Sequence, residues 1–185
     1  MAASLHVLVL AAGASTQQGQ PKQIVKLGGR PVLHRVVANA VTLAGHAVTV
    51  VLGAHARELM RMLAHSPASV VVHRGWEEGL GSSLRFGMSV LPSGCDAVLV
   101  LLGDQFAVTA DDLKRLASAW RSEQSLIAAS VYANSIGVPA IFPYLCFQEL
   151  AQLRGDQGAR RILERNTYRL VRVPMPNAAI DLNAP

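Results

Sequence analysis

Small and polar residues that could hold a phosphate group follow the first apolar run of the chain. Ala11-Ala12-Gly13-Ala14-Ser15 comes directly after Leu10, and Lys22 stands a little further on. Small side chains let backbone N–H groups converge on a phosphate, and a lysine adds a flexible positive charge. The spacing fits neither the P-loop pattern nor the dinucleotide-binding GxGxxG pattern. For this loop taken alone, an ordinary glycine-rich turn remains the alternative.

A second candidate segment contains His73, Trp76, Ser82 and Ser83. Two hydroxyl groups at the start of a helix, beside flexible glycines, can bind an anion or a sugar hydroxyl. Taken alone, Ser82 and Ser83 are more simply explained as an ordinary helix cap. His73 and Trp76 are likewise explained as a structural histidine and a packed aromatic residue. A functional interpretation of this segment therefore depends on the loops that lie beside it.

Groups that could hold a divalent cation occur at two places. Asp104 lies in the turn Gly103-Asp104-Gln105, which follows the most apolar run of the sequence, at 97–102. A carboxylate at the end of a buried strand is well placed to hold a metal ion against phosphates. Near the C-terminus, Asp181-Leu182-Asn183 puts an acid and an amide on one face of an extended segment. A frayed terminus is the alternative there.

Short apolar runs alternate with helical patterns along the chain. The predicted strands are 5–10, 47–52, 69–73, 97–102, 125–131, 138–142 and 169–173. The predicted helices are about 31–44, 54–64, 82–91, 109–120, 144–153 and 156–165, with Thr109 as an N-terminal cap. This alternation predicts an α/β, Rossmann-like three-layer fold with a mainly parallel sheet and helices on both faces. Ligands of such sheets bind at the carboxyl ends of the strands, which here means after Leu10, His73 and Leu102.

The composition excludes several classes of protein. Of 185 residues, 51% are hydrophobic and 16% charged, which excludes a disordered chain and favours one domain over 1–185. Cys95 and Cys146 are too few for a disulfide framework or a cysteine-based zinc site. No apolar stretch reaches the ~18–20 residues of a membrane span, and no basic region precedes the first apolar run, as a signal peptide would require. We therefore expect a cytoplasmic protein without a membrane partner.

The net charge of +5 indicates an anionic partner. Nucleic acid is one candidate, but only 5% of residues are aromatic and no zinc-finger or RNA-recognition pattern occurs. A cationic surface also suits a small anionic substrate such as a nucleotide. We therefore predict a phosphorylated small molecule and no nucleic acid.

Taken together and in this order, the segments resemble the molybdenum cofactor nucleotidyltransferases. The family pattern LAAGxSxRMGxxK is matched by Leu10-Ala11-Ala12-Gly13-Ala14-Ser15, Gly19 and Lys22. Further matches are Trp76, Gly79 and Ser82-Ser83-Leu84, the turn Gly103-Asp104-Gln105, the segment 137–142 (GVPAIF) and the segment 155–160 (GDQGAR). The nearest branch resembles the cytidylyltransferases that serve molybdoenzymes of the xanthine dehydrogenase type. Ala12 favours that branch, because the related guanylyltransferases tend to carry glycine there.

The resemblance implies a nucleotidyltransferase fold of the GT-A-like type and a Mg²⁺-dependent reaction. The enzyme would transfer a cytidylyl group from CTP to molybdopterin, with a molybdoenzyme as a further partner. Asp104 and Lys22 are then the catalytic residues, and Asp104 and Asn183 the metal ligands. The nucleotide-binding residues would be Leu10, Ala11, Ala12, Gly13, Ala14, Ser15, Lys22, His73, Ser82 and Ser83.

The sequence departs from the family pattern at several positions. Gln17-Gln18 replaces Arg-Met, Phe106 replaces a proline, His73 stands where asparagine is common, and Asn183 replaces an aspartate. An amide oxygen binds Mg²⁺ without a full negative charge. A guanylyltransferase or another NTP transferase of the same fold, and a nucleotide-binding relative with impaired turnover, remain the alternative functions.

Overall fold

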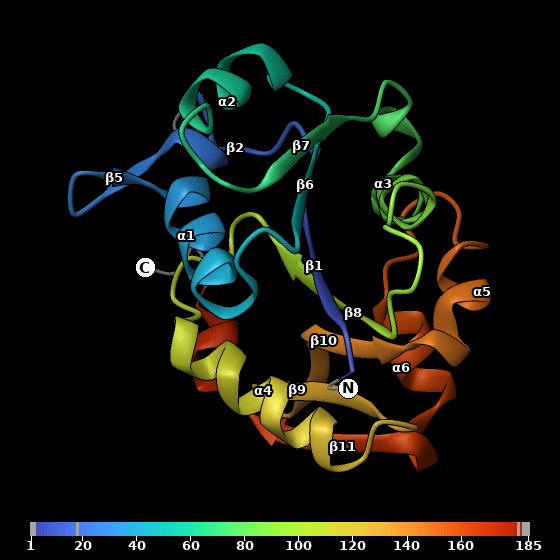
Figure 1. Cartoon of the computed structure of the whole chain (residues 1–185). Coiled ribbons are helices and arrows are strands. Elements are labelled where there is room, and N and C mark those ends of the chain that lie inside the picture. The colour runs from blue at the N-terminus through green and yellow to red at the C-terminus, as the bar shows by residue number, and fades with distance from the viewer. Residues whose placement is uncertain (1–2, 18, 181, 183–185) are drawn as a thin grey trace.

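A seven-stranded sheet forms the centre of the molecule (Figure 1). The computed structural model describes residues 3–17, 19–180 and 182. The strand order is β11-β9-β10-β8-β1-β6-β7, and β10 alone among these strands runs antiparallel to its neighbours. The strands are β1 Leu5–Ala11, β6 Val48–Leu52, β7 Ser69–Val72, β8 Ala97–Leu102, β9 Ile127–Tyr132, β10 Ser135–Pro143 and β11 Leu170–Pro174. The prediction of a mainly parallel sheet is confirmed.

Helices cover both faces of this sheet, which completes the predicted three layers (Figure 1). One face carries α1 Val32–Ala44, α2 Ala56–Met62 and α4 Ala110–Ser122. The other carries α3 Leu80–Ser89, α5 Phe147–Leu150 and α6 Arg160–Arg165. No helix in the described part of the chain is long and apolar enough to cross a membrane.

Strand β1 is buried on both sides, which explains its unbroken apolar sequence. Val7 and Val9 belong to the core on the α1 face, whereas Leu8 and Leu10 belong to the core on the α3 face. Full burial of each such side chain stabilises the fold by about 1.5–3 kcal/mol. Parallel strands β6 and β8 flank β1 through residues 5–11. The loop that follows β1 therefore starts from a fixed point in the sheet.

Short elements connect this loop to α1. They are the two-stranded ribbons β2 Thr16–Gln17 with β3 Gln20–Pro21, and β4 Lys26–Leu27 with β5 Arg30–Pro31. The 3₁₀ turn η1, Lys22–Ile24, lies between them. Four further 3₁₀ turns are η2 Trp76–Glu78, η3 Tyr144–Cys146, η4 Thr167–Arg169 and η5 Pro176–Ala179.

The predicted helix boundaries were partly wrong. Thr109 caps α4 as expected, because its Oγ1 accepts from the Asp112 amide at 3.1 Å and the Asp112 carboxylate accepts from the Thr109 amide at 3.0 Å. Ser82 and Ser83 do not cap α3, which begins at Leu80 after Gly79. The predicted helices 144–153 and 156–165 are shorter, since α5 spans four residues and α6 begins only at Arg160.

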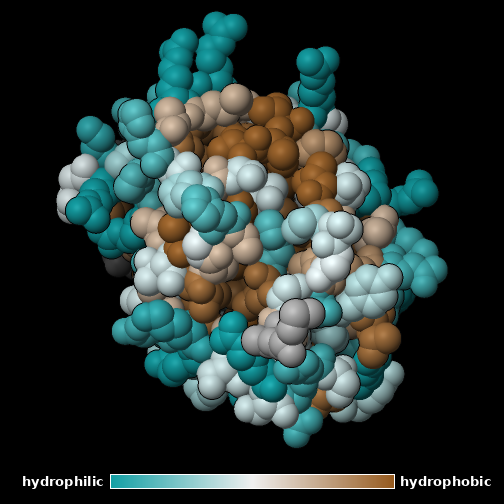
Figure 2. Space-filling view, viewed as in Figure 1, coloured by the Kyte–Doolittle hydropathy of each residue, from teal (hydrophilic) through white to brown (hydrophobic). Residues whose placement is uncertain are grey.

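Hydrophobic side chains reach the surface near the sheet edge formed by β7. In Figure 2 they gather around α2 and β7, in the upper part of the view. Met60 of α2 is 45% exposed and Val72 of β7 is 39% exposed. This surface lies at the opposite edge of the sheet from β11.

Candidate functional site

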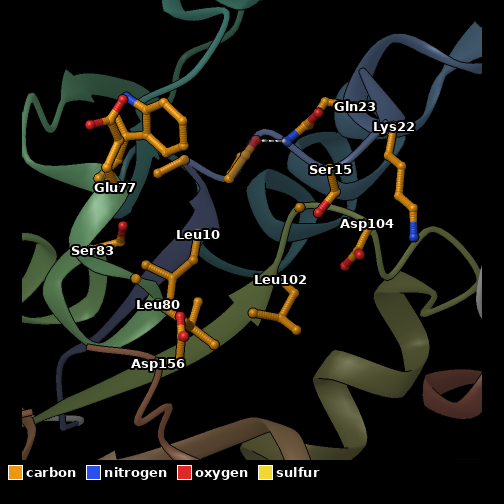
Figure 3. Close-up of a pocket in the computed structure, with 16 residues that line it drawn as sticks. Leu10, Ser15, Lys22, Gln23, Glu77, Leu80, Ser83, Leu102, Asp104 and Asp156 are labelled. Carbon is orange, nitrogen blue, oxygen red and sulfur yellow. Dashed lines mark hydrogen bonds between the residues drawn. The ribbon is translucent and has the colours of Figure 1, made fainter. Parts of the chain in front are cut away.

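A cavity of about 440 Å³ opens at the carboxyl ends of β1 and β8 (Figure 3). This is the edge of the sheet at which ligands bind in folds of this type. The predicted site residues that line it are Leu10, Ala11, Ala12, Gly13, Ser15, Lys22, Ser83 and Asp104. Three loops that are far apart in sequence thus meet at one cavity.

The loop after β1 directs its carbonyl groups toward other parts of the protein. The carbonyl of Leu10 accepts from the Gly103 amide at 2.8 Å, and that of Ala12 accepts from the Ala54 amide at 2.9 Å. The carbonyl of Ser15 accepts from the Lys22 amide at 2.9 Å. A carbonyl oxygen facing a triphosphate would repel it, so these bonds favour a loop that presents N–H groups to an anion.

Gln23 completes this arrangement at Gly13. Its Nε2 donates to the Gly13 carbonyl at 3.0 Å, and Figure 3 shows this bond at the edge of the cavity. Gln23 is only 6% exposed, and its Oε1 is buried without a hydrogen-bond partner among the described residues. Among the described residues, the Gly13, Ala14 and Ser15 amides likewise donate to no carbonyl. These N–H groups are the donors that a phosphate could use.

The turn that carries Asp104 is held by the two neighbouring strands. Gln105 is buried and bridges β8 to β10, since its Oε1 accepts from the Leu102 amide at 3.1 Å and its Nε2 donates to the Val138 carbonyl at 2.7 Å. Gly103 lies so close to β1 that an added Cβ would be 2.7 Å from the Cβ of Ala11. The half-buried Asp104 therefore extends into the cavity from a rigid turn (Figure 3).

Ser82 and His73 lie behind the cavity wall rather than on it. Ser82 is fully buried, and its Oγ lies 3.1 Å from His73 Nε2, 2.9 Å from the Gly79 carbonyl and 3.2 Å from the Gly75 carbonyl. A hydroxyl has one proton, so when Ser82 donates it to a carbonyl, His73 Nε2 must be the donor to Ser82. Burial, and then the nearby Arg85, lower the pKa of His73. The pair fixes the turn before α3, and Ser83 is the serine that lines the cavity.

A segment from the second half of the chain closes the cavity beside α3. Glu78 forms an ion pair with Arg85 at 2.8 Å, and Arg85 also donates to the Leu153 carbonyl at 2.7 Å. The hydrogen bond from Arg85 lowers the pKa of Glu78. The Gly81 amide donates to the Gly155 carbonyl at 2.7 Å. These contacts bring Asp156 to the cavity, next to Gly79, where any Cβ would collide with the Asp156 carboxylate.

The cavity offers a suitable place for a divalent cation at Asp104. Mg²⁺ is commonly held by one or two carboxylates together with substrate phosphates and water. The described residues contain no cluster of three or more histidine, cysteine or acidic side chains. The donor set therefore fits a cation that arrives with a phosphorylated substrate. The predicted second ligand, Asn183, lies outside the described residues.

Sequence reasoning missed several residues of the cavity wall. Gln23, Glu77, Leu80 and Asp156 line it and were not predicted as site residues, whereas the predicted Ala14, His73 and Ser82 do not line it. Gln23 is adjacent to Lys22, and Asp156 belongs to the GDQGAR segment, so both stood within motifs already noted. The position of Asp156 at the cavity depends on contacts between distant parts of the chain, such as the hydrogen bond from Arg85 to the Leu153 carbonyl.

Known protein sequences resemble this chain over most of its length. A family model described as "MobA-like NTP transferase domain" matches residues 7–172. The purine catabolism protein PucB of Bacillus subtilis is 30% identical over 84% of this chain and 78% of its own length. The nicotine blue oxidoreductase of Paenarthrobacter nicotinovorans is 27% identical over 87% of this chain and 82% of its own length.

Solved structures show the same fold. Rv0371c of Mycobacterium tuberculosis superimposes with a TM-score of 0.82 at 26% identity, covering 95% of this chain and 90% of its own. The same protein has also been crystallised as a complex with manganese, which superimposes with a TM-score of 0.79 at 25% identity and covers 94% of this chain and 89% of its own.

Proposed function

Because the chain belongs to the MobA-like NTP transferase family, we propose that it transfers a cytidylyl group from CTP to molybdopterin. Membership of the family supports nucleotidyl transfer as the type of reaction. The observation that carries the proposal is the loop after β1. Its Ala12, Gly13 and Ser15 carbonyls accept hydrogen bonds from other residues, and among the described residues its Gly13, Ala14 and Ser15 amides donate to no carbonyl and could meet an anion. Ala12 supports the cytidylyl branch, since the guanylyl relatives tend to carry glycine at that position.

The proposed step is a displacement at phosphorus. An oxygen of the terminal phosphate monoester of molybdopterin attacks the α-phosphorus of CTP, and a new P–O bond forms. The bond between the α-phosphorus and the oxygen bridging to the β-phosphate breaks, and its electron pair leaves with pyrophosphate. The attacking phosphate is already ionised near neutral pH, so no general base is required. Such a reaction depends mainly on positioning and on neutralisation of charge.

The residues of the cavity divide these tasks. The amides of residues 13–15 and the Lys22 ammonium would hold the β- and γ-phosphates. The Asp104 carboxylate would hold Mg²⁺, which when bound supplies positive charge beside the phosphates. Ala12, Trp76 and Ser83 also line the cavity, and the base and ribose would lie against them. Gly103 and Gln105 keep Asp104 in place through β1 and β10.

A second candidate function is nucleotide binding with little or no turnover. One observation favours it: Gln17, which replaces the arginine of the family pattern, donates through Nε2 to the Leu182 carbonyl at 2.6 Å. An amide engaged with the chain in this way gives no charged contact to a triphosphate. The same catalytic core with another base preference, such as that of a guanylyltransferase, is distinguished by the nucleotide that it consumes.

Pyrophosphate release tests these alternatives directly. The protein is mixed with molybdopterin, Mg²⁺ and either CTP, GTP or ATP, and pyrophosphate is measured over time. Our proposal predicts release with CTP that requires both molybdopterin and the metal. Preference for GTP would instead indicate a guanylyltransferase. Binding of CTP by calorimetry without pyrophosphate release from any nucleotide would support the binding protein and contradict the proposed reaction.

A further inference from the structure

Three large hydrophobic side chains are exposed at the end of the sheet opposite the cavity. Tyr168 is 79% exposed, Tyr144 68% and Leu145 66%, and these are the three most exposed large hydrophobic residues of the described chain. Tyr144 and Leu145 lie in η3, which follows β10, and Tyr168 lies in η4, which precedes β11. A single exposed hydrophobic residue is ordinary, but several gathered at one place indicate contact with another molecule.

The strand order brings η3 and η4 together. β11 begins at Leu170, which pairs with the first residue of β9, and β10 ends at Pro143, which pairs with the first residue of β8. Only β9 lies between β10 and β11, so the two turns leave the sheet two strand spacings, or roughly 10 Å, apart. The cavity lies at the other end of β8, roughly 20 Å away along that strand. In Figure 1 this part of the chain is orange to red and lies to the right of and below β8.

The positive charge of the chain is concentrated in the segment that contains η4. Residues 154–172 contain six arginines and two acidic residues, and so carry +4 of the net charge of +5. Arg165 ends α6, Arg169 ends η4, and Arg172 donates to the Thr167 carbonyl of η4 at 3.3 Å. In the described part of the chain, none of these three arginines forms an ion pair with an acidic side chain.

Arg169 connects the two turns. It donates to the Ser125 carbonyl, just before β9, at 3.3 Å. Burial raises the pKa of the Cys146 thiol in η3 to about 11, and the Arg169 guanidinium opposes this increase. The charge of Arg169 therefore acts on η3 as well as on η4. The exposed Glu149 also acts on this thiol, in the opposite direction, but one carboxylate beside three guanidinium groups leaves an excess of positive charge.

We propose that these turns form a docking surface for an acidic segment of a partner protein. This Tyr–Arg surface consists of Tyr144, Leu145, Arg165, Tyr168, Arg169 and Arg172. Tyrosine and arginine are enriched at protein–protein interfaces, whereas lysine is depleted, and the chain contains no lysine after Lys114. Arginine binds a carboxylate through two parallel hydrogen bonds, which a lysine cannot form. A partner segment with glutamates or aspartates beside an apolar side chain matches both the charge and the hydrophobic part of the surface.

Other occupants match the Tyr–Arg surface less well. A second copy of this chain would place like charges against each other, which is unfavourable across an interface. Single-stranded nucleic acid stacks its bases on aromatic rings, and Leu145 offers no such ring. Because the surface lies at the other end of the sheet, a bound partner leaves the cavity open. Docking here is therefore independent of the proposed function.

Three substitutions at exposed positions test the Tyr–Arg surface. Leu145→Ser and Tyr168→Ser remove the hydrophobic contacts, and Arg165→Gln removes a charge from the last turn of α6. The matched controls are Met60→Ser, on an exposed hydrophobic residue of α2, and Arg121→Gln, on an exposed arginine in the last turn of α4. None of these side chains lines the cavity. Urea unfolding should give the same stability, within error, for all five variants and wild type.

Fluorescence anisotropy measures binding of labelled synthetic peptides in which glutamates flank a leucine, a phenylalanine or a tryptophan. We expect wild type to bind at least one of them, with an affinity that falls as salt is added. The dissociation constant should rise roughly tenfold in Leu145→Ser and Tyr168→Ser and roughly fivefold in Arg165→Gln. It should stay at the wild-type value in Met60→Ser and Arg121→Gln. Absence of binding to all three peptides, or equal affinities in wild type and the three surface variants, would overturn the proposal.

Hydrogen–deuterium exchange locates the bound peptide. Slower exchange at residues 144–150 and 165–170 supports the Tyr–Arg surface, whereas slower exchange confined to the loop after β1 would place the peptide in the cavity and contradict it.

The other occupants have their own measurements. If a single-stranded DNA oligonucleotide or vesicles of anionic phospholipid bind more tightly than the peptides, and the three surface variants lose that binding, the surface serves nucleic acid or a membrane and the proposal is wrong. Sedimentation tests the second copy. A wild-type dimer that Leu145→Ser converts to a monomer would show that another copy of this chain covers the surface, and would equally overturn the proposal.

Discussion

The side-chain amide of Gln23 holds the carbonyl of Gly13 at 3.0 Å, so the residue after Lys22 controls the orientation of the loop after β1. Lys22 supplies its own amide to the Ser15 carbonyl at 2.9 Å. Two consecutive residues of η1 thus fix two carbonyls of the loop. The lysine side chain and the loop amides are positioned by the same turn.

Gln23→Leu should weaken CTP binding with little effect on stability. The substitution frees the Gly13 carbonyl to turn toward the phosphates, which should cost about 1–3 kcal/mol, or roughly 5–150-fold in affinity. Stability should change little, because the hydrogen bond to Gly13 is lost together with Oε1, which is buried without a partner among the residues that the structure describes. Calorimetry of CTP binding and urea unfolding measure the two effects. The exposed Gln20→Leu is the control, and equal CTP affinity in both variants would exclude Gln23 from this role.

Lys22→Met should also reduce CTP affinity. A hydrogen bond from an ammonium to a phosphate is worth about 1.5–3 kcal/mol, so the dissociation constant should rise roughly 10–150-fold. Methionine keeps the length and apolar part of the side chain, which limits any loss of packing. Lys26→Met, on an exposed lysine of β4, tests whether net charge alone is responsible. If both variants bind CTP equally well, Lys22 is not a phosphate ligand.

Asp104→Asn should lower metal-dependent turnover by about 100-fold or more, since a metal beside a phosphate contributes several kcal/mol to the transition state. The amide fits the same space, and the turn is held by Gly103 and Gln105, so the fold should persist. The measurement is the rate of pyrophosphate release as Mg²⁺ is raised. Asp111→Asn, at an exposed position of α4, is the control. Normal turnover in Asp104→Asn would refute the metal assignment.

Local sequence patterns predicted the sheet and half of the residues that line the cavity, because both depend on short segments. The apolar run that ends at Leu10 and the run 97–102 each predicted a strand followed by a functional loop, and both loops line the cavity. The start of α3 was wrong because Gly79 adopts φ 118°, which places the turn before the serines and buries them. Gly81, just before the two serines, also donates its amide to the Gly155 carbonyl, so the start of α3 is fixed in part by a distant segment. No local pattern contains that contact.

His73 should make the free energy of unfolding depend on pH between its lowered folded pKa and its unfolded pKa of about 6.5. Its folded pKa is lowered, so the unfolded chain binds the proton more readily than the folded one. Its contribution to stability is therefore complete above the unfolded value of about 6.5 and is lost as the pH falls toward the lowered folded pKa. The free energy of urea unfolding of wild type should decrease from pH 7.5 to 5 more steeply than that of His73→Asn. Parallel curves would show that folding does not shift the pKa of His73, since the other histidines are unchanged in both proteins.

The variant Gln17→Arg tests whether glutamine, in place of the family's arginine at this position, limits the rate of the proposed reaction. Gln17 joins β2 to Leu182, and its Oε1 is buried without a partner among the described residues. An arginine has a planar set of donors suited to phosphate, and one such contact can be worth about 1.5–3 kcal/mol. We therefore expect Gln17→Arg to raise the rate of pyrophosphate release roughly 10–150-fold if the contact strengthens in the transition state. Gln17→Met is the matched control, because it breaks the bond to Leu182 without adding charge. If Gln17→Arg is no faster than Gln17→Met, residue 17 does not reach the phosphates, and its effect on the reaction is limited to the position of Leu182.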